Sequence, residues 1–341
     1  MVGETDNLIY GRTSNPYDLS RIPGASSGGS AAIVAAGGSP FDLGSDTAGS
    51  IRLPSHYCGI AGIRPTSGRV PRTGHIIPYG MGVVDSQTQI GPMARFVEDL
   101  ALVLPIISGS DWRDPGIVDM PLRDPNTVSI KGLRVAYYTD NGLMTPISEI
   151  VKAVELAGSV LADAGANVAA DSSPKVIKLA NALGTRLRDG DGRAWVKRLL
   201  QKYGTTEVYP FLEKSVEAAK PYSSVEEFTK LLEEVDSFRS SMLDFMKDYD
   251  VIICPVSAFA APLHGSMISQ NISSVVTSRG YNYTGIFNIT GWPAAVVRGG
   301  SSPEGLPIGV QIVGRSWHED VVLAVAQHLE KVLGGWQRPP I

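Results

Sequence analysis

Two short runs of small residues lie close together near the start of the sequence: Pro23–Ser30, "PGASSGGS", and Gly44–Ser50, "GSDTAGS". The apolar segment "AAIVAAGG" follows the first run and separates it from the second. Glycine permits backbone conformations that expose successive N–H groups. A serine hydroxyl is a weak nucleophile, and it needs a base and donors for the oxyanion that forms on attack. The second run offers such donors beside Ser50, and the first offers another hydroxyl and more N–H groups beside Ser26.

Several alternatives compete with a catalytic interpretation of these runs. A Gly-Ser stretch before a helix is most often only a turn. The first run has neither the Gly-Lys-Ser/Thr ending of a phosphate loop nor a GxGxxG pattern. The segment "AGSIR" does not match the GxSxG nucleophile elbow, which disfavours an α/β-hydrolase. None of the five histidines has a diagnostic context, and His328 lies in an amphipathic terminal segment that favours a structural role.

Composition narrows the class of protein. With 341 residues, of which 43% are apolar, the chain can bury a core large enough for one large domain or two smaller ones. Its 34 acidic and 30 basic residues leave a net charge of -4, without the basic surplus of a nucleic-acid-binding protein. Cys58 and Cys254 lack metal-site spacing and indicate buried, reduced thiols. We expect a cytoplasmic protein, because neither a signal peptide nor a membrane-spanning stretch is visible.

Apolar runs bounded by turn signals predict alternating helices and strands, and therefore an α/β class. Helices are expected at 31–36, 95–107, 145–164 and 318–334, and strands at 132–140, 167–174, 250–257, 293–300 and 307–314. Thr145 and Pro146 are expected to begin the third helix as N-cap and first position, and Gly165 to end it. The charged segment from about 175 to 250 is predicted to be a helical insertion, with Ser224 and Glu227 forming a capping box.

A family resemblance extends this interpretation to nearly the whole chain. Residues 11–74, "GRTSNPYDLSRIPGASSGGSAAIVAAGGSPFDLGSDTAGSIRLPSHYCGIAGIRPTSGRVPRTG", are similar to the signature region of the amidase signature family. "GPMAR" follows in the same order. The later segments "YDVIICPV" and "NITGWPAAVVRGGSSPEGLPIGVQIVGR" resemble the same family. The resemblance implies one amidase signature domain over 1–341, with a mixed central β-sheet covered by helices on both faces and the 175–250 insertion shaping the substrate pocket.

The same resemblance implies roles for individual residues. Ser50 would be the nucleophile, and Ser26, which in this family precedes an unusual cis peptide bond, would be the bridging serine that relays protons. The remaining site residues carried over are the oxyanion-hole N–H groups of Thr47, Ala48, Gly49 and Ser50, and the supporting side chains of Asp46, Arg52 and Ser27. Ala48 stands where glycine is common in the family, which would narrow the pocket slightly.

The family's third catalytic residue is a lysine that lies well upstream of the serine turns. None of the 25 residues before Ser26 is lysine, and the first lysine is Lys131. We therefore expect that the N-terminal portion with this base is missing, through a fragment or a natural truncation. A relocated lysine is a third alternative, but it would need a rebuilt pocket. Loss of the base would remove about 10²–10⁴-fold in rate, and amides would suffer more than activated esters.

The implied reaction is hydrolysis of a carboxylic amide through an acyl-enzyme on Ser50, without cofactor or metal. The region after Ser50 resembles stand-alone amidases, including aryl-acylamidase and urethane-cleaving types, more than the glutaminyl-tRNA amidotransferase subunit, which implies a small-molecule amide or ester as substrate. The alternatives are a glutaminyl-tRNA amidotransferase A-type subunit, an esterase, and a non-catalytic remnant that binds a carbonyl ligand. The segment Tyr281–Ala295 is interpreted either as a substrate-facing wall or as core packing. The oligomeric state stays open, with a homodimer among the alternatives.

Overall fold

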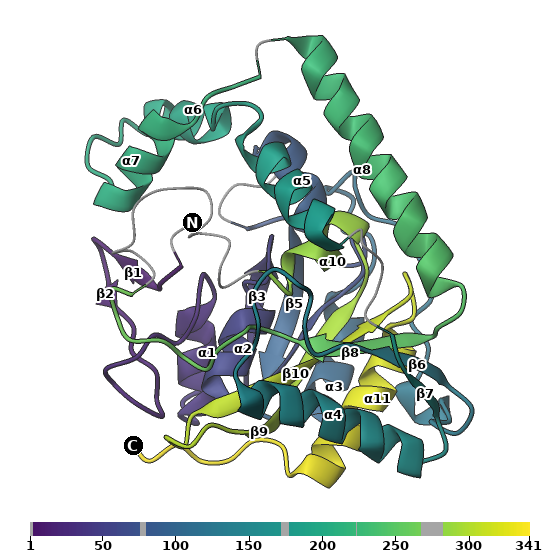
Figure 1. Ribbon diagram of the computed structural model, residues 1–341. Coiled ribbons are helices and arrows are strands. Elements are labelled where there is room, and N and C mark those ends of the chain that lie inside the picture. Colours follow the sequence, from purple (N-terminus) through teal and green to yellow (C-terminus); the bar gives the residue numbers. More distant parts are fainter. Residues whose placement is uncertain (1–2, 76–79, 172–176, 223, 267–281) are drawn as a thin grey trace.

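One mixed sheet organises the protein. The computed structural model describes residues 3–75, 80–171, 177–222, 224–266 and 282–341 (Figure 1). Its large sheet has eight strands in the order β3-β5-β4-β9-β10-β8-β6-β7. The strands in spatial order are β3 (Phe41–Asp46), β5 (Gln89–Ala94), β4 (Ala61–Arg64), β9 (Ala294–Ser301), β10 (Pro307–Gly314), β8 (Val251–Pro255), β6 (Arg134–Tyr137) and β7 (Asn167–Ala170). Strand β6 runs parallel to both β7 and β8, and the other pairs are antiparallel, so the expected mixed α/β sheet is confirmed.

Helices cover both faces of this sheet. Strand β10 shows why, because its side chains alternate: Val310 and Ile312 join one apolar core, while Gln311 and Val313 face the other side. The first face is covered by α3 (Val97–Ile107), α4 (Ser148–Asp163) and α11 (Glu319–Leu333). The second is covered by α1 (Gly28–Ala35), α2 (Arg52–Cys58), α5 (Ile177–Asp189), α8 (Val225–Met246) and α10 (Gly285–Thr290). In Figure 1 the sheet separates α5 and α8 from α4 and α11.

The charged segment after residue 175 is helical, as its composition predicts. Besides α5 and α8 it contains α6 (Ala194–Lys202) and α7 (Pro210–Ala218). Trp195 and Val196 of α6 pack with Met81 and Val84, around the 3-10 helix η1 (Gly82–Gln87). This contact joins the helical segment to the residues that lead into β5.

The remaining elements are short. They are the two-stranded sheet of β1 (Asp6–Asn7) and β2 (Gly11–Arg12), and the 3-10 helix η2 (Pro125–Thr127). Among the described residues, no helix combines the length and the apolar character that crossing a membrane requires.

The predicted start of α4 is wrong. The helix begins at Ser148, and its N-cap is Ile147 instead of Thr145. Tertiary contacts hold the preceding residues outside the helix: the Thr145 hydroxyl donates to Asp140 at 3.0 Å, and the Ile147 N–H donates to the carbonyl of Ala258 at 2.9 Å. The predicted end is confirmed, because Gly165 follows the C-cap with a φ of +89°.

Other sequence boundaries are correct to within a few residues. The expected helix at 31–36 begins earlier, at Gly28, and the expected strand at 132–140 is shortened to Arg134–Tyr137. The strand expected at 167–174 ends at Ala170, and residues 172–176 lie outside the described residues. Ser224 caps α8 as predicted, since its hydroxyl accepts from the Glu227 N–H at 3.1 Å.

Candidate active site

The first serine turn needs glycine for steric reasons. Gly24 has a φ of +88°, and a Cβ there would lie 2.8 Å from the Pro54 backbone. The next peptide bond, Ala25–Ser26, is cis. Ser26 therefore follows the cis bond, which corrects the expectation that it precedes it. The Ser26 side chain is exposed, and α1 begins two residues later.

The second turn joins the edge strand β3 to α2. Strand β3 ends at Asp46, and residues 47–51 form the turn before Arg52 begins the helix. Gly49 is buried and has a φ of +136°, a conformation that L side chains rarely adopt. Ser50 is half-buried at the end of this turn.

Ser27 brings the two turns together. Its backbone N–H donates to the carbonyl of Ser50 at 3.3 Å. Its hydroxyl also accepts from the Ser45 N–H at 3.2 Å and donates to the Ser45 carbonyl at 3.3 Å. Two segments that are distant in sequence are thus tied by one residue, next to both Ser26 and Ser50.

Most backbone carbonyls of the second turn accept hydrogen bonds. The bound carbonyls are those of Asp46 (Asn288 Nδ2, 3.1 Å), Ala48 (Thr284 Oγ1, 2.5 Å), Gly49 (Leu53 N, 2.7 Å) and Ser50 (Ser27 N, 3.3 Å). In the described part of the chain, the backbone N–H groups of residues 47–50 have no acceptor. In a trans peptide the C=O and N–H point in opposite directions. The turn can therefore present N–H donors to an anionic oxygen beside Ser50.

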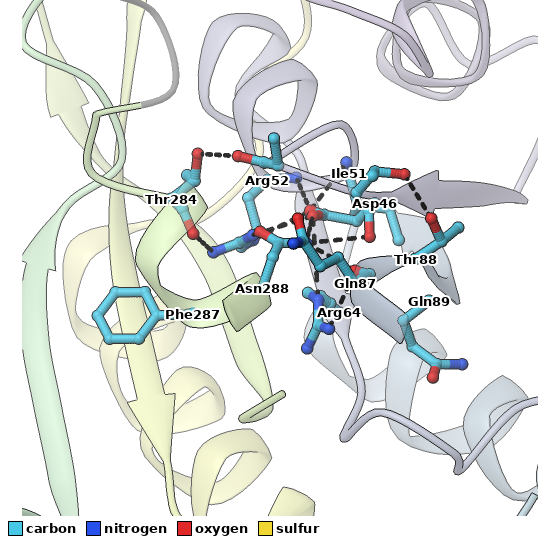
Figure 2. Close-up of polar contacts among 12 residues, drawn as sticks. Asp46, Ile51, Arg52, Arg64, Gln87, Thr88, Gln89, Thr284, Phe287 and Asn288 are labelled. Atoms are coloured by element: carbon cyan, nitrogen blue, oxygen red, sulfur yellow. Dashed lines mark hydrogen bonds and ion pairs between the residues drawn. The ribbon is translucent and has the colours of Figure 1, made fainter. Parts of the chain in front are cut away.

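A buried ion pair anchors the base of the turn. Arg52 and Asp46 are both fully buried and form a two-pronged pair, with Nη2–Oδ1 at 2.9 Å and Nε–Oδ2 at 3.0 Å (Figure 2). The same carboxylate accepts from the backbone N–H groups of Ile51 at 3.2 Å and Arg52 at 3.4 Å. Burial alone would raise the pKa of Asp46, but the charge and hydrogen bonds of Arg52, with help from Arg64 and Asn288, lower it to about 2. Asp46 is thus ionised at neutral pH.

Contacts from other elements complete the network. Asn288 of α10 donates to the Asp46 carboxylate at 2.8 Å and accepts from Arg52 at 2.5 Å. Arg52 also donates to Gln311 of β10 at 2.8 Å. Thr47 and Thr88, just before β5, share a hydrogen bond of 2.8 Å between their hydroxyls. Figure 2 shows Asp46, Arg52, Asn288 and Thr88 lying together, although they come from different parts of the chain.

Sequence reasoning missed Thr88, Thr284, Asn288 and Gln311 as individual site residues. Asn288 and Gln311 both lie in the segment "NITGWPAAVVRGGSSPEGLPIGVQIVGR", which carried part of the family resemblance, so the sequence held a signal for them that was not assigned to individual residues. Within residues 282–295, the aromatic side chains of Tyr283, Phe287 and Trp292 are nearly fully buried in the apolar core that includes residues of α5, α8 and β8, whereas Thr284 and Asn288 contact the site. Tyr281 itself lies outside the described residues.

The histidine beside the second turn, His56, is bonded to the backbone. His56 of α2 is fully buried, and both ring nitrogens bond to backbone groups, Nδ1 to the Gly309 N–H at 2.7 Å and Nε2 to the Phe259 carbonyl at 3.1 Å. Burial lowers its pKa to about 4, so it is neutral at pH 7. Over the described ranges, no group of three or more His, Cys, Asp or Glu side chains could hold a metal ion.

Comparison with known proteins places this geometry in a family. A family model described as Amidase matches residues 1–323. Among curated proteins, the A-type subunit of glutamyl-tRNA(Gln) amidotransferase from Acinetobacter baumannii is 32% identical, over 97% of this chain and 71% of its own length. Human fatty-acid amide hydrolase 2 is 31% identical, over 98% of this chain and 65% of its own length.

Solved structures agree with the sequence comparisons. The 6-aminohexanoate cyclic dimer hydrolase, complexed with substrate, superposes with a TM-score of 0.88 at 26% identity, over 100% of this chain and 74% of its own. A bacterial aryl acylamidase of the amidase signature family gives 0.82 at 26% identity, over 97% of this chain and 70% of its own. The chain, with its paired serine turns on a mixed sheet, therefore belongs to the amidase signature family, whose members are C–N hydrolases acting on amides.

Proposed function

We propose that the protein hydrolyses a carboxylic amide through an acyl-enzyme on Ser50. The observation that carries this proposal is the turn at residues 47–50, which ends at the half-buried Ser50 and whose backbone N–H groups have no acceptor among the described residues. Such donors stabilise the negative oxygen of a tetrahedral intermediate and are commonly worth about 10²–10³-fold each in rate.

The proposed mechanism divides the work between the two turns. Ser50 attacks the carbonyl carbon and gives its proton to Ser26, whose hydroxyl passes its own proton to the leaving amine as the C–N bond breaks. The N–H groups of Thr47, Ala48, Gly49 and Ser50 receive the oxyanion. Water then cleaves the acyl-enzyme. Metal ions and cofactors have no part in this scheme.

The supporting residues act through position. Asp46 and Arg52 fix both ends of the turn. The Asp46 carboxylate accepts from the N–H groups of Ile51 and Arg52, and the Arg52 guanidinium donates to Gln311 of β10. Ser27 keeps the turns together through the contacts with Ser45 and Ser50. We propose that Ser27 thereby keeps Ser26 within reach of Ser50.

For the substrate we propose a small-molecule amide, carbamate or ester. The structural likeness to 6-aminohexanoate cyclic dimer hydrolase and to an aryl acylamidase favours a free-standing hydrolase. We also propose that the helices of 175–250 shape the acyl side of the pocket, because Trp195 and Val196 pack beside η1, which leads to Thr88 and so to Thr47. Cys58 and Cys254 are buried and unpaired, which supports a cytoplasmic setting.

The second candidate is one component of an amidotransferase. Relatives named as the A-type subunit of glutamyl-tRNA(Gln) amidotransferase are 32% identical to this chain, which is the observation that favours it. A component of this kind would co-purify with partner proteins, whereas a free hydrolase would act alone.

The first experiment measures Ser50 chemistry directly. The purified protein is treated with a fluorophosphonate probe and, separately, with a p-nitrophenyl ester, whose leaving group needs no protonation. We expect wild type to be labelled and to release p-nitrophenolate, and Ser50→Ala to lose both activities. Ser159→Ala is the matched control, since Ser159 is an exposed serine of α4 on the far face of the sheet. An unlabelled wild type would favour the non-catalytic alternative, and a labelled Ser50→Ala would exclude Ser50 as the nucleophile.

A further inference from the structure

A buried threonine binds the candidate oxyanion turn from the opposite side of the site. Thr284 is fully buried and lies at the N-cap position of α10, far along the chain from the turn. Its hydroxyl Oγ1 donates to the carbonyl of Ala48 at 2.5 Å, and its own carbonyl accepts from Arg52 at 2.9 Å (Figure 2).

The direction of this hydroxyl is unusual for its position. An N-cap threonine ordinarily accepts from an N–H of its own helix. Thr284 has no such capping bond, and its φ and ψ of -98° and -38° are helical. The Thr284 hydroxyl donates to the turn and does not cap its own helix α10.

Peptide geometry links this contact to the site. The Ala48–Gly49 bond is trans, so a carbonyl held toward Thr284 directs the Gly49 N–H to the opposite side. Gly49, with its φ of +136°, is the residue of the turn about which this peptide plane can rotate most easily. The hydrogen bond from the Thr284 hydroxyl to the Ala48 carbonyl opposes rotation of the Ala48–Gly49 peptide plane.

We propose that Thr284 is a positioning residue for catalysis, which aims the Gly49 N–H at the oxyanion by holding the Ala48 carbonyl. This inference rests on the proposed function, because it needs Ser50 to be the nucleophile and the turn to be the oxyanion hole. It adds a residue outside both serine turns to the machinery of the reaction.

The test compares Thr284→Val with Thr284→Ser. Valine keeps the shape and removes the O–H, while serine keeps the O–H and removes a methyl group. The backbone carbonyl that binds Arg52 is present in both variants. The readouts are the rate constant of fluorophosphonate labelling at Ser50 and the kcat and KM for a p-nitrophenyl ester. Rate constants are normalised by the end-point of labelling, so partial unfolding changes the amplitude and not the rate.

For Thr284→Val we expect labelling and kcat to fall about 10–100-fold with KM changed less than about 3-fold, because the donor is misaligned but not removed. Thr284→Ser should stay within about 3-fold of wild type in both readouts. Thr284→Ala replaces valine if the valine variant does not fold.

Each other outcome overturns the inference. Wild-type rates in Thr284→Val would show that the hydroxyl does not position the donor, and the proposed function would stand if Ser50→Ala is inactive. Equal losses in the valine and serine variants would show that keeping the O–H does not preserve the rate, so the effect would come from the altered side-chain packing and not from the hydrogen bond. Failure of wild type to label would remove the proposed function and this inference together.

Discussion

At the scale of single residues, the buried charges behind the serine turns are tolerated because their partners are nearly complete. The Asp46 carboxylate has Arg52, Asn288 and two backbone N–H groups around it, with no exposed surface. The Arg52 guanidinium bonds in turn to the carbonyl of Thr284 and to Gln311. A buried charge that loses its partner is costly, so this network sets the position of the turn with little freedom.

Replacement of Asp46 should therefore destabilise the protein. In Asp46→Asn the Arg52 charge stays buried without its counter-charge, and we expect the free energy of unfolding to fall by about 3–5 kcal/mol. Urea denaturation measures this loss. Asp236→Asn is the matched control: it breaks an exposed pair with Arg239 on α8 and should cost less than about 1 kcal/mol. Equal losses in the two variants would show that burial of the Asp46 pair has no energetic consequence.

At the scale of elements, capping decides where some helices begin and tertiary contacts decide others. Helix α8 starts at its local signal, because the Ser224 hydroxyl accepts from the Glu227 N–H. Helix α4 does not begin at the equally good capping signal of Thr145 and Pro146, because Thr145 is hydrogen-bonded to Asp140 and Ile147 to Ala258. A capping motif predicts a helix start only where no competing partner reaches it.

The cap of α8 can be tested within the same helix. Ser224→Ala removes the capping oxygen and should lower the free energy of unfolding by about 1 kcal/mol. Thr229→Ala is the control, because the Thr229 hydroxyl bonds only within the helix, to the Val225 carbonyl, on an exposed face. Alanine has the higher helix propensity, so this variant should be neutral or slightly stabilised. Thermal unfolding of both variants measures the two changes in stability. A larger loss of stability in Thr229→Ala than in Ser224→Ala would contradict the assigned cap.

At the scale of the whole molecule, distant segments meet at buried polar groups that respond to pH. His56 joins α2 to β10 and to Phe259, and burial lowers its pKa to about 4. Glu330 of α11 accepts from the Val97 N–H at the start of α3, and burial with the charges of Glu98 and Asp99 raises its pKa to about 7. The two groups act in opposite directions on stability.

The signs follow from where the proton binds. In the unfolded chain the histidine takes up a proton below about pH 6.5, whereas in the folded protein His56 does so only below about pH 4. The contribution of His56 to the free energy of unfolding is therefore complete above pH 6.5 and is lost as the pH falls to 4. Folded Glu330 is protonated below about 7 and the unfolded group below about 4.5, so stability from Glu330 is gained as pH falls through that window. Because the two windows overlap, the sum of these two contributions changes less with pH than either contribution alone.

A variant isolates the histidine. Asn can keep an acceptor for the Gly309 N–H without titrating, so the stability difference between wild type and His56→Asn should change by about 3 kcal/mol in favour of the variant between pH 7 and pH 4. Glu330 is common to both proteins and cancels in the difference. Urea denaturation at several pH values measures it, and a constant difference would show that folded His56 titrates normally.

Local patterns in the sequence determined the α/β alternation, the two serine turns and the cap of α8, while the resemblance to the amidase signature family implied the mixed sheet. These are local patterns or contiguous motifs, and their physical causes act between residues close along the chain. Only the tertiary structure decided the start of α4 and the side of Ser26 on which the cis bond lies. It also decided that Thr284 binds the turn at residues 47–50, and that Asn288 and Gln311 bind the flanking residues Asp46 and Arg52. Those contacts join residues more than two hundred positions apart, and packing of the sheet against α2 and α10, not local preference, selects which side chains meet there.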